Sequence, residues 1–347
     1  MIKDIRVLDL FCGCGGLSSG FIDAGFTITH GIDNWKDAIN TFNFNHKGST
    51  GIVADLGKID AKTIIEEYKI DSIDIIIGGP PCQGFSIAGK RNVEDERNLL
   101  YKSFLEFVKI LKPKAFLIEN VPNIFSMGKG IVKENIVSDF EKIGYKVKTN
   151  ILMASEYGVP QNRKRAFFIG HSKKSEYKFP NQKIKKLISS KEAISDLPDQ
   201  NIDDGASYPI KANSTFQKLM RKGSRKLFNH QLTNHEQKTI NTISLVPDGG
   251  NYKNLPSELK DTRRVNIAWT RLNSSKPSFT IDTGHRHHFH YKFNRVPTVR
   301  ESARIQSFND KFIFTGSKTS QYKQVGNAVP PILAKHLANS LKPLFDV

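Results

Sequence analysis

Short apolar segments alternate with segments of helical spacing through about the first 170 residues, and this alternation limits the fold more than any other feature of the chain. Residues 5–10, 26–32, 73–77 and 115–118 are predicted to be buried strands, and residues 61–69 have the spacing of a helix. Strands that alternate with helices form a mostly parallel sheet with helices on both faces. The sequence therefore predicts a doubly wound α/β domain.

The character of the sequence changes after residue 171. Residues 173–191 are basic, the apolar periodicity weakens, and prolines interrupt the chain at positions 180, 198, 209, 247 and 256. A chain of 347 residues is long enough for two lobes. We therefore expect a second, irregular lobe, followed by a helix over residues 329–341 that returns the C-terminus to the first lobe.

The turn after the first strand is rich in glycine. Gly13 and Gly15 allow backbone amides to approach a ligand at the start of a helix near Leu17. A nicotinamide dinucleotide is weakly supported, because Ser18 stands where its fingerprint needs a third glycine. Asp33 follows the second strand, where a carboxylate can bind a ribose diol, although a turn-forming role is equally open.

The strand at 73–77 ends in the stretch GGPPCQGFS at 78–86. Two glycines and two prolines force a sharp turn, which places Cys82 beyond the carboxyl end of the strand, where open α/β sheets bind ligands. A cysteine held there is a candidate nucleophile, and the alternative is a half-buried structural cysteine. Glu119 follows the strand at 115–118 in the same way.

Six motifs occur in one order along the chain: DLFCGCGG at 9–16, PCQ at 81–83, ENV at 119–121, QNRKR at 161–165, RESARIQ at 300–306 and QVGNAV at 324–329. In sequence and order they resemble the motifs of the DNA (cytosine-5) methyltransferases. Only about 172–290 lies outside a recognisable motif. The resemblance implies a Rossmann-like, S-adenosylmethionine-dependent methyltransferase domain at 1–175, completed by 321–347, and a smaller irregular DNA-recognition domain at 176–320.

The resemblance also implies the reaction, which is methyl transfer from S-adenosylmethionine to C5 of a cytosine flipped out of duplex DNA. Cys82 would attack C6, because adding a thiolate there turns C5 into a nucleophile. Glu119 would act at N3, with burial raising its pKa, and Arg165 would stabilise charge at O2. Arg163 would orient Glu119 or its loop. The base that removes the C5 proton is not assigned, and no metal is required.

Cofactor-binding residues are implied by the same motifs. Phe11 would lie against the adenine, Asp33 would bind the ribose, and Asp55 would accept from the adenine amino group, although Asp55 is open to a capping role as well. The full set is Phe11, Cys12, Gly13, Gly15, Leu17, Asp33, Asn34, Asp55, Leu56, Pro80, Leu100, Asn327 and Val329.

The charge balance favours a polyanionic partner. The chain has 52 Lys and Arg against 34 Asp and Glu, a formal net charge of +18, and residues 211–230 hold six basic side chains and no acidic one. A generally basic surface is the alternative. The predicted DNA-binding residues are Gln83, Ser86, Arg97, Arg221, Lys222, Arg225, Lys226 and Arg286. The histidine-rich stretch 283–300 is expected to touch phosphate rather than zinc, because no cysteine or carboxylate there has metal spacing.

Other classes of protein fit less well. An oxidoreductase or a binding module without catalysis would leave the PPCQ stretch unexplained, and an RNA cytosine-5 methyltransferase is the nearest alternative. Three cysteines form no disulfide framework, and no apolar run approaches the roughly 18 residues of a membrane span. We therefore expect a cytoplasmic, monomeric modification enzyme of bacterial or phage type, without a membrane partner. A cognate restriction endonuclease would act separately.

Overall fold

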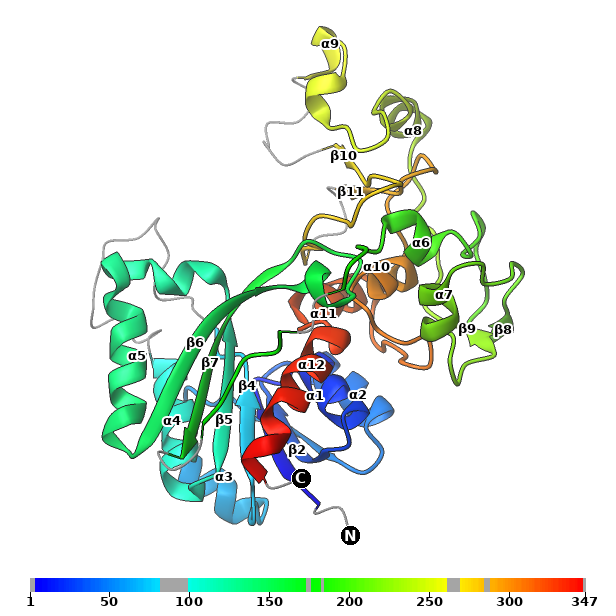
Figure 1. The fold of residues 1–347 in the computed structure, drawn as a ribbon. Helices are drawn as coiled ribbons and strands as arrows, with labels where there is room; N and C mark the ends of the chain where they lie inside the picture. The colour runs from blue at the N-terminus through cyan, green and yellow to red at the C-terminus, as the bar shows by residue number, and fades with distance from the viewer. Residues whose placement is uncertain are drawn as a thin grey trace. The chain divides into compact units, whose positions relative to one another are not determined.

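The computed structural model describes residues 4–81, 99–172, 176–181, 184–260, 269–283 and 288–345. The chain divides into two compact units (Figure 1). The first unit contains Met1–Met153, Lys164–Gln182 and Leu333–Val347, and the second contains Ala154–Arg163 and Lys183–Ile332.

A seven-stranded sheet forms the centre of the first unit, in the order β3-β2-β1-β4-β5-β7-β6. The strands are β1 (Arg6–Leu10), β2 (Thr27–Asp33), β3 (Thr50–Val53), β4 (Ile75–Gly78), β5 (Ala115–Asn120), β6 (Tyr145–Met153) and β7 (Lys164–Ser172). The first five are parallel, and β7 is antiparallel to both of its neighbours. The predicted α/β fold with a mostly parallel sheet is confirmed.

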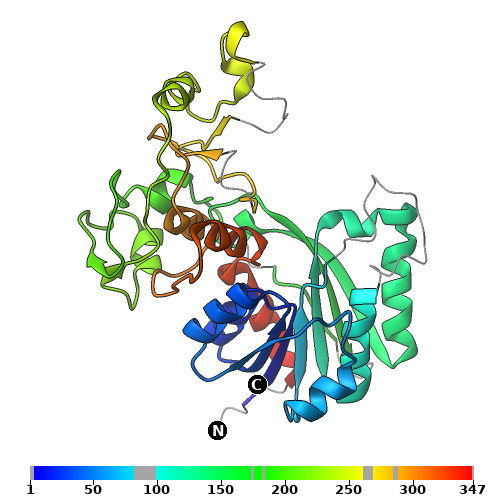
Figure 2. The ribbon, with the colours of Figure 1, turned by 180° about the vertical axis from the view of Figure 1, so that it is seen from behind.

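Helices cover both faces of this sheet. They are α1 (Gly16–Asp23), α2 (Lys36–Asn45), α3 (Ala61–Glu67), α4 (Leu99–Leu111), α5 (Ile131–Lys142) and α12 (Pro331–Leu341). One face packs on α3, α4 and α5 through a core that includes Phe104, Phe116 and Phe140, while α1, α2 and α12 gather on the other side (Figure 2). Because both faces are covered, Ile75, Ile76 and Ile77 are all fully buried, as expected for a central parallel strand.

The second unit is built from short elements. Its helices are α6 (Ser190–Ile194), α7 (Thr215–Met220), α8 (Gln237–Ser244), α9 (Ser257–Lys260), α10 (Val299–Ile305) and α11 (Lys318–Asn327). Two two-stranded ladders, β8 (Ala206–Ser207) with β9 (Lys226–Leu227) and β10 (Thr270–Arg271) with β11 (His288–Phe289), complete it. Capping boxes begin α6, α7 and α10, which explains how helices of five to seven residues start at defined positions.

The two units depart from the predicted domain boundaries at 154–163 and 321–332, which fall in the second unit, and at 176–182, which falls in the first. Long-range hydrogen bonds explain the first assignment, because Asn162 N donates to Ser278 O over 2.7 Å and Ile281 N donates to Gln161 Oε1 over 2.9 Å. The second follows from the Gln306 amide, which donates to Val325 O over 3.1 Å and to Ala328 O over 2.6 Å.

Candidate active site

The carboxyl ends of four parallel strands meet at one edge of the sheet in the first unit. Leu10 on β1 pairs with Ile32 on β2 and with Gly78 on β4, and Gly78 pairs with Ile118 on β5. The residues that follow these positions include Phe11, Asp33, Pro80 and Glu119. The register therefore brings the predicted cofactor and catalytic residues to the edge where open α/β sheets bind their ligands.

Left-handed backbone conformations shape the glycine-rich turn after β1. Phe11, Gly13 and Gly15 have φ values of 57°, 53° and 89°. A Cβ atom at Gly15 would overlap the ring of His46, so only glycine fits there, whereas the corresponding space at Gly13 is open. The turn is thus packed against side chains at Gly15, and it faces open space at Gly13.

The carboxylate of Asp33 fastens this turn to the end of β2. Gly13 N donates to Asp33 Oδ2 over 2.9 Å, and Trp35 N donates to Oδ1 over 2.8 Å. Burial raises the pKa of Asp33, and the hydrogen bonds from Trp35 and Gly13 partly offset that rise. The turn-organising role that the sequence left open is therefore present, and binding of a ribose diol stays a prediction.

A second carboxyl group, Asp9, lies beneath the same turn, and the sequence motifs gave it no role. Its side chain is buried, Ser18 Oγ donates to Oδ2 over 2.6 Å, and Oδ1 has no hydrogen-bond partner among the described residues. Burial raises the pKa of Asp9 to about 7. An acidic residue inside an otherwise apolar strand was the signal that could have identified it.

Two of the three cysteines are unsuited to nucleophilic attack. Cys12 and Cys14 are both buried, and burial raises the pKa of the Cys14 thiol to about 12 and that of Cys12 well above its usual value. A thiol with a raised pKa is a poor source of thiolate. Cys82 lies outside the described residues, as do the predicted DNA-binding residues Gln83, Ser86, Arg97 and Arg286.

Glu119 and Arg165 form an ion pair at the end of β5. Arg165 Nε lies 2.8 Å from Glu119 Oε1, and the two side chains are 14% and 13% exposed, the arginine first. The antiparallel pairing of β5 with β7 sets Glu119 opposite Phe167, two residues from Arg165, so the two side chains can meet diagonally. A Cβ atom at Gly79 would lie 3.0 Å from Glu119 Oε2, so glycine leaves room for the carboxylate. The structure therefore brings together two of the predicted catalytic residues.

Asn120, to which the sequence motifs gave no separate role, ties Pro80 to the same strand end. The Asn120 side chain is buried, its Nδ2 donates to Pro80 O over 2.9 Å, and its Oδ1 accepts from Val121 N over 2.9 Å. Pro80 is two residues before Cys82. This amide thus fixes the backbone at Pro80, and Glu119 is its neighbour in sequence.

Three other predicted cofactor residues lie together on neighbouring turns. Asp55 Oδ1 accepts from Gly57 N over 3.0 Å, and Ser103 Oγ on α4 donates to Leu56 O over 2.6 Å. A Cβ atom at Gly57 would lie 3.1 Å from Leu100 Cδ2. The start of α4 therefore packs on the turn after β3, which places Leu100 beside Asp55 and Leu56.

The remaining predicted catalytic residue, Arg163, belongs to the second unit, as do Asn327 and Val329. The Arg163 side chain is buried and donates to Ile281 O over 3.2 Å and to Gly326 O over 2.9 Å. These bonds explain why an arginine is buried there. Its role in orienting Glu119 stays a prediction.

The expectation that the stretch 283–300 presents a basic strand to phosphate is wrong for its described arginines. Arg295 is buried and pairs with Asp199 over 2.6 Å and with Glu301 over 2.8 Å. Arg300 is fully buried and donates to Phe228 O over 3.0 Å and to Phe312 O over 2.7 Å. These arginines looked unpaired in the sequence because most of their partners come from other segments of the chain.

The fold and the ion pair at its sheet edge fit the methyltransferase that the sequence motifs indicate, and comparison with known proteins specifies the kind of enzyme. The chain belongs to the C-5 cytosine-specific DNA methylase family, whose model matches residues 5–343. It is therefore a DNA cytosine-5 methyltransferase, and the RNA alternative loses its support. The described residues contain no helix long and apolar enough to cross a membrane.

Relatives match along almost the whole chain. The Type II methyltransferase M.DdeI of Desulfomicrobium norvegicum is 38% identical over 99% of this chain and 89% of its own length. The Type II methyltransferase M1.HphI of Haemophilus parahaemolyticus is 35% identical over 97% and 86%. A crystal structure of a prophage-encoded E. coli protein, described as a DNA modification methyltransferase, has a TM-score of 0.83 at 28% identity and covers 99% of this chain and 100% of that one.

Proposed function

We propose that this chain methylates C5 of one cytosine within a specific duplex DNA sequence, with Cys82 as nucleophile and S-adenosylmethionine as methyl donor. The Glu119–Arg165 ion pair is the observation that carries the proposal, and the neighbouring residue Asn120 donates to the Pro80 carbonyl. The ion pair presents an acid and a cation together at the edge where the Cys82 loop begins, which is what the N3 and O2 atoms of an attacked cytosine require.

The chemistry of the ring explains these roles. C5 of cytosine is a poor nucleophile, and addition of the Cys82 thiolate to C6 moves electron density toward N3 and O2. A protonated Glu119 can donate to N3 while the Arg165 guanidinium stabilises charge at O2. When Glu119 is neutral in that state, the developing charge on the base replaces the carboxylate as the partner of Arg165. Once C5 carries the methyl group, loss of the C5 proton and expulsion of Cys82 restore the aromatic ring.

The residues at the sheet edge fit S-adenosylmethionine. The cofactor supplies an electrophilic methyl group when bound. Gly13 faces open space, backbone amides gather at the start of α1, and the Asp33 carboxylate lies at the end of β2. Asp55, Leu56 and Leu100 would enclose the adenine end. Asn34, Cys12, Leu17, Pro80, Asn327 and Val329 complete the proposed set, the last two from the second unit.

Duplex DNA is the proposed partner. The formal charge of +18 attracts a polyanion, and the relatives that match nearly the whole chain carry the name Type II methyltransferase. The target base must leave the stack, at a cost of a few kcal/mol, before a side chain can reach C6. We propose that the chain is the modification half of a restriction–modification system, acting separately from its endonuclease.

A duplex with 5-fluorocytosine at the target position tests the proposal. Fluorine cannot leave C5 as a cation, so the covalent adduct should persist in the presence of S-adenosylmethionine. Mass spectrometry should find it on Cys82, and Cys82→Ser should form none while still binding the cofactor. Glu119→Gln should form it far more slowly. Adduct on another residue, or strong activity of Cys82→Ser, would contradict the mechanism.

A further inference from the structure

A strongly basic turn follows α7 in the second unit. This basic turn, residues 221–226, contains Lys222, Arg225 and Lys226, and all three side chains are exposed. No acidic residue occurs from 205 to 230. None of the three side chains has an acidic partner in the described part of the chain. Their charges are therefore available to an external anion.

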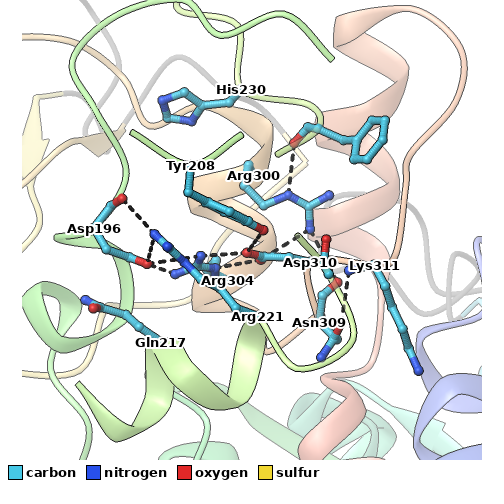
Figure 3. Close-up of polar contacts among 12 residues, drawn as sticks. Asp196, Tyr208, Gln217, Arg221, His230, Arg300, Arg304, Asn309, Asp310 and Lys311 are labelled. Carbon is cyan, nitrogen blue, oxygen red and sulfur yellow. Dashed lines mark hydrogen bonds and ion pairs between the residues drawn. The ribbon is translucent and has the colours of Figure 1, made fainter. Parts of the chain in front are cut away.

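The first residue of the basic turn behaves differently. Arg221 Nη2 lies 2.5 Å from Asp196 Oδ2 and donates to Asp196 O over 3.1 Å, and its side chain is only 14% exposed (Figure 3). Its guanidinium also stacks on the Tyr208 ring, with Cζ 3.8 Å from the ring centre. Arg221 was predicted to bind phosphate, but its guanidinium is already paired with Asp196 inside the unit.

A buried polar network fixes the position of Asp196 and Tyr208, the two residues that contact the Arg221 side chain. Arg304 donates to Asp196 Oδ1 over 2.8 Å and to both carboxylate oxygens of Asp310 over 2.6 Å, and the Tyr208 hydroxyl donates to Asp310 Oδ2 over 2.6 Å (Figure 3). Burial opposes ionisation of Asp310, yet Arg304 outweighs it and lowers the Asp310 pKa. Removing one partner from such a network leaves a buried charge without compensation, so its geometry is strongly defined.

The loop after α10 fastens the other side of the basic turn. Asn309 Nδ2 donates to Leu219 O over 3.3 Å and to Lys222 O over 3.1 Å, and Asn309 Oδ1 accepts from Lys311 N over 3.0 Å. A Cβ atom at Gly223 would lie 3.9 Å from Lys311 Cδ. The Lys311 side chain is exposed and has no acidic partner among the described residues. It therefore joins the basic turn as a fourth unpaired cation, although 85 residues or more separate it from the turn in sequence.

We propose that Lys222, Arg225, Lys226 and Lys311 form a surface that binds the phosphate backbone of the substrate DNA duplex, and that Arg221 and Asn309 are positioning residues for it. This inference rests on the proposed action on duplex DNA. Four cations on one turn and its neighbouring loop suit successive phosphates, and such contacts position a protein without reading sequence. The surface therefore sets affinity and not the choice of target.

A quadruple variant tests the surface. Lys222→Gln, Arg225→Gln, Lys226→Gln and Lys311→Gln together should weaken binding equally to a duplex that contains the target and to one that lacks it. The slope of log affinity against log salt should shrink by about 0.9 for each phosphate that the variant no longer neutralises. The KM for DNA should rise while kcat at saturating DNA stays the same. The matched control neutralises four exposed lysines on helices of the first unit, Lys62, Lys102, Lys109 and Lys142. If both quadruple variants have the same DNA affinity and the same salt dependence, the proposed phosphate-binding surface is contradicted.

A double-mutant cycle separates positioning from direct contact. Arg221→Gln should weaken DNA binding in the wild-type background but add nothing in the quadruple background, because it acts only through the other cations. A further slope change of about 0.9 in the quadruple background would make Arg221 a phosphate contact and overturn its positioning role. If melting shows that Arg221→Gln does not fold, Asn309→Ala replaces it, since it removes no charge. A wild-type protein that methylates no DNA would refute the proposed function instead, independently of these binding measurements.

Discussion

At the scale of single residues, folding disfavours the ionised form of Asp9, which lies in β1 just before the glycine-rich turn. Asp9 is buried with one oxygen unpartnered among the described residues, and the hydrogen bond from Ser18 satisfies only the other. Taking a carboxylate out of water favours its protonated form. The native state therefore binds a proton at Asp9 that the unfolded chain releases near its ordinary pKa.

Replacing this carboxyl by an amide should change how stability depends on pH. The pKa of Asp9 rises from 3.8 to about 7 on folding, so the wild type loses stability as pH rises through this window. Asp9→Asn has no such loss. Its free energy of unfolding relative to wild type should increase by roughly 2–3 kcal/mol between pH 5 and pH 8.

Urea unfolding at several pH values measures this difference. A constant offset between wild type and Asp9→Asn across that range would show that Asp9 stays ionised in the native state. Ser18→Ala provides a companion variant. Because the Ser18 hydrogen bond lowers the Asp9 pKa, its loss should move the window to higher pH.

At the scale of elements, the most informative helix is α10, in which all seven residues are buried. Its charged side chains reach partners outside the helix: Glu301 pairs with Arg295, and Arg304 pairs with Asp196 and Asp310. The Arg295 charge outweighs burial and keeps the pKa of Glu301 well below its usual range. The RESARIQ motif is therefore an organising core of the second unit.

The glycine-rich turn makes a prediction at the same scale. Gly15→Ala places a methyl group against His46 and Phe42 at φ 89°, so it should destabilise the first unit and weaken binding of S-adenosylmethionine. Gly25→Ala is a matched control, because Gly25 has the same φ and a methyl group there would have no atom within 4 Å. The control should lose about 1–2 kcal/mol from backbone strain alone and keep its cofactor affinity.

Calorimetric titration and thermal unfolding of both variants decide the point. The free energy of unfolding of Gly15→Ala should be lower than that of the control by roughly 1–3 kcal/mol, because the added methyl group overpacks the site. Equal stability and equal cofactor affinity would show that the turn relaxes around the added methyl group without consequence.

At the scale of the whole molecule, local patterns predicted the parallel sheet well, because β-branched runs such as Ile75–Ile77 report burial directly. Motif resemblance found Glu119 and Arg165, which the structure pairs. Long-range pairing was not predictable. Arg221 looked like a free cation because Asp196 is 25 residues away, and nothing in the sequence connects Lys311 to the basic turn, which it reaches through the fold, beside Gly223 and Asn309. Periodicity carries no information about which distant charges meet.

At the scale of the whole enzyme, activity in cells should produce 5-methylcytosine at defined positions in the genome. DNA from cells that express the chain should contain 5-methylcytosine within one short sequence, and cells that express Cys82→Ser should contain none. The physical reason is that duplex sequences are distinguished in the major groove, where each wrong base pair costs about 1–3 kcal/mol, so rates at mismatched sites should fall roughly 5- to 150-fold. Bisulfite sequencing of DNA and RNA from the same cells makes the measurement. Methylation confined to RNA would contradict the proposed substrate, and methylation at cytosines in every context would contradict sequence recognition.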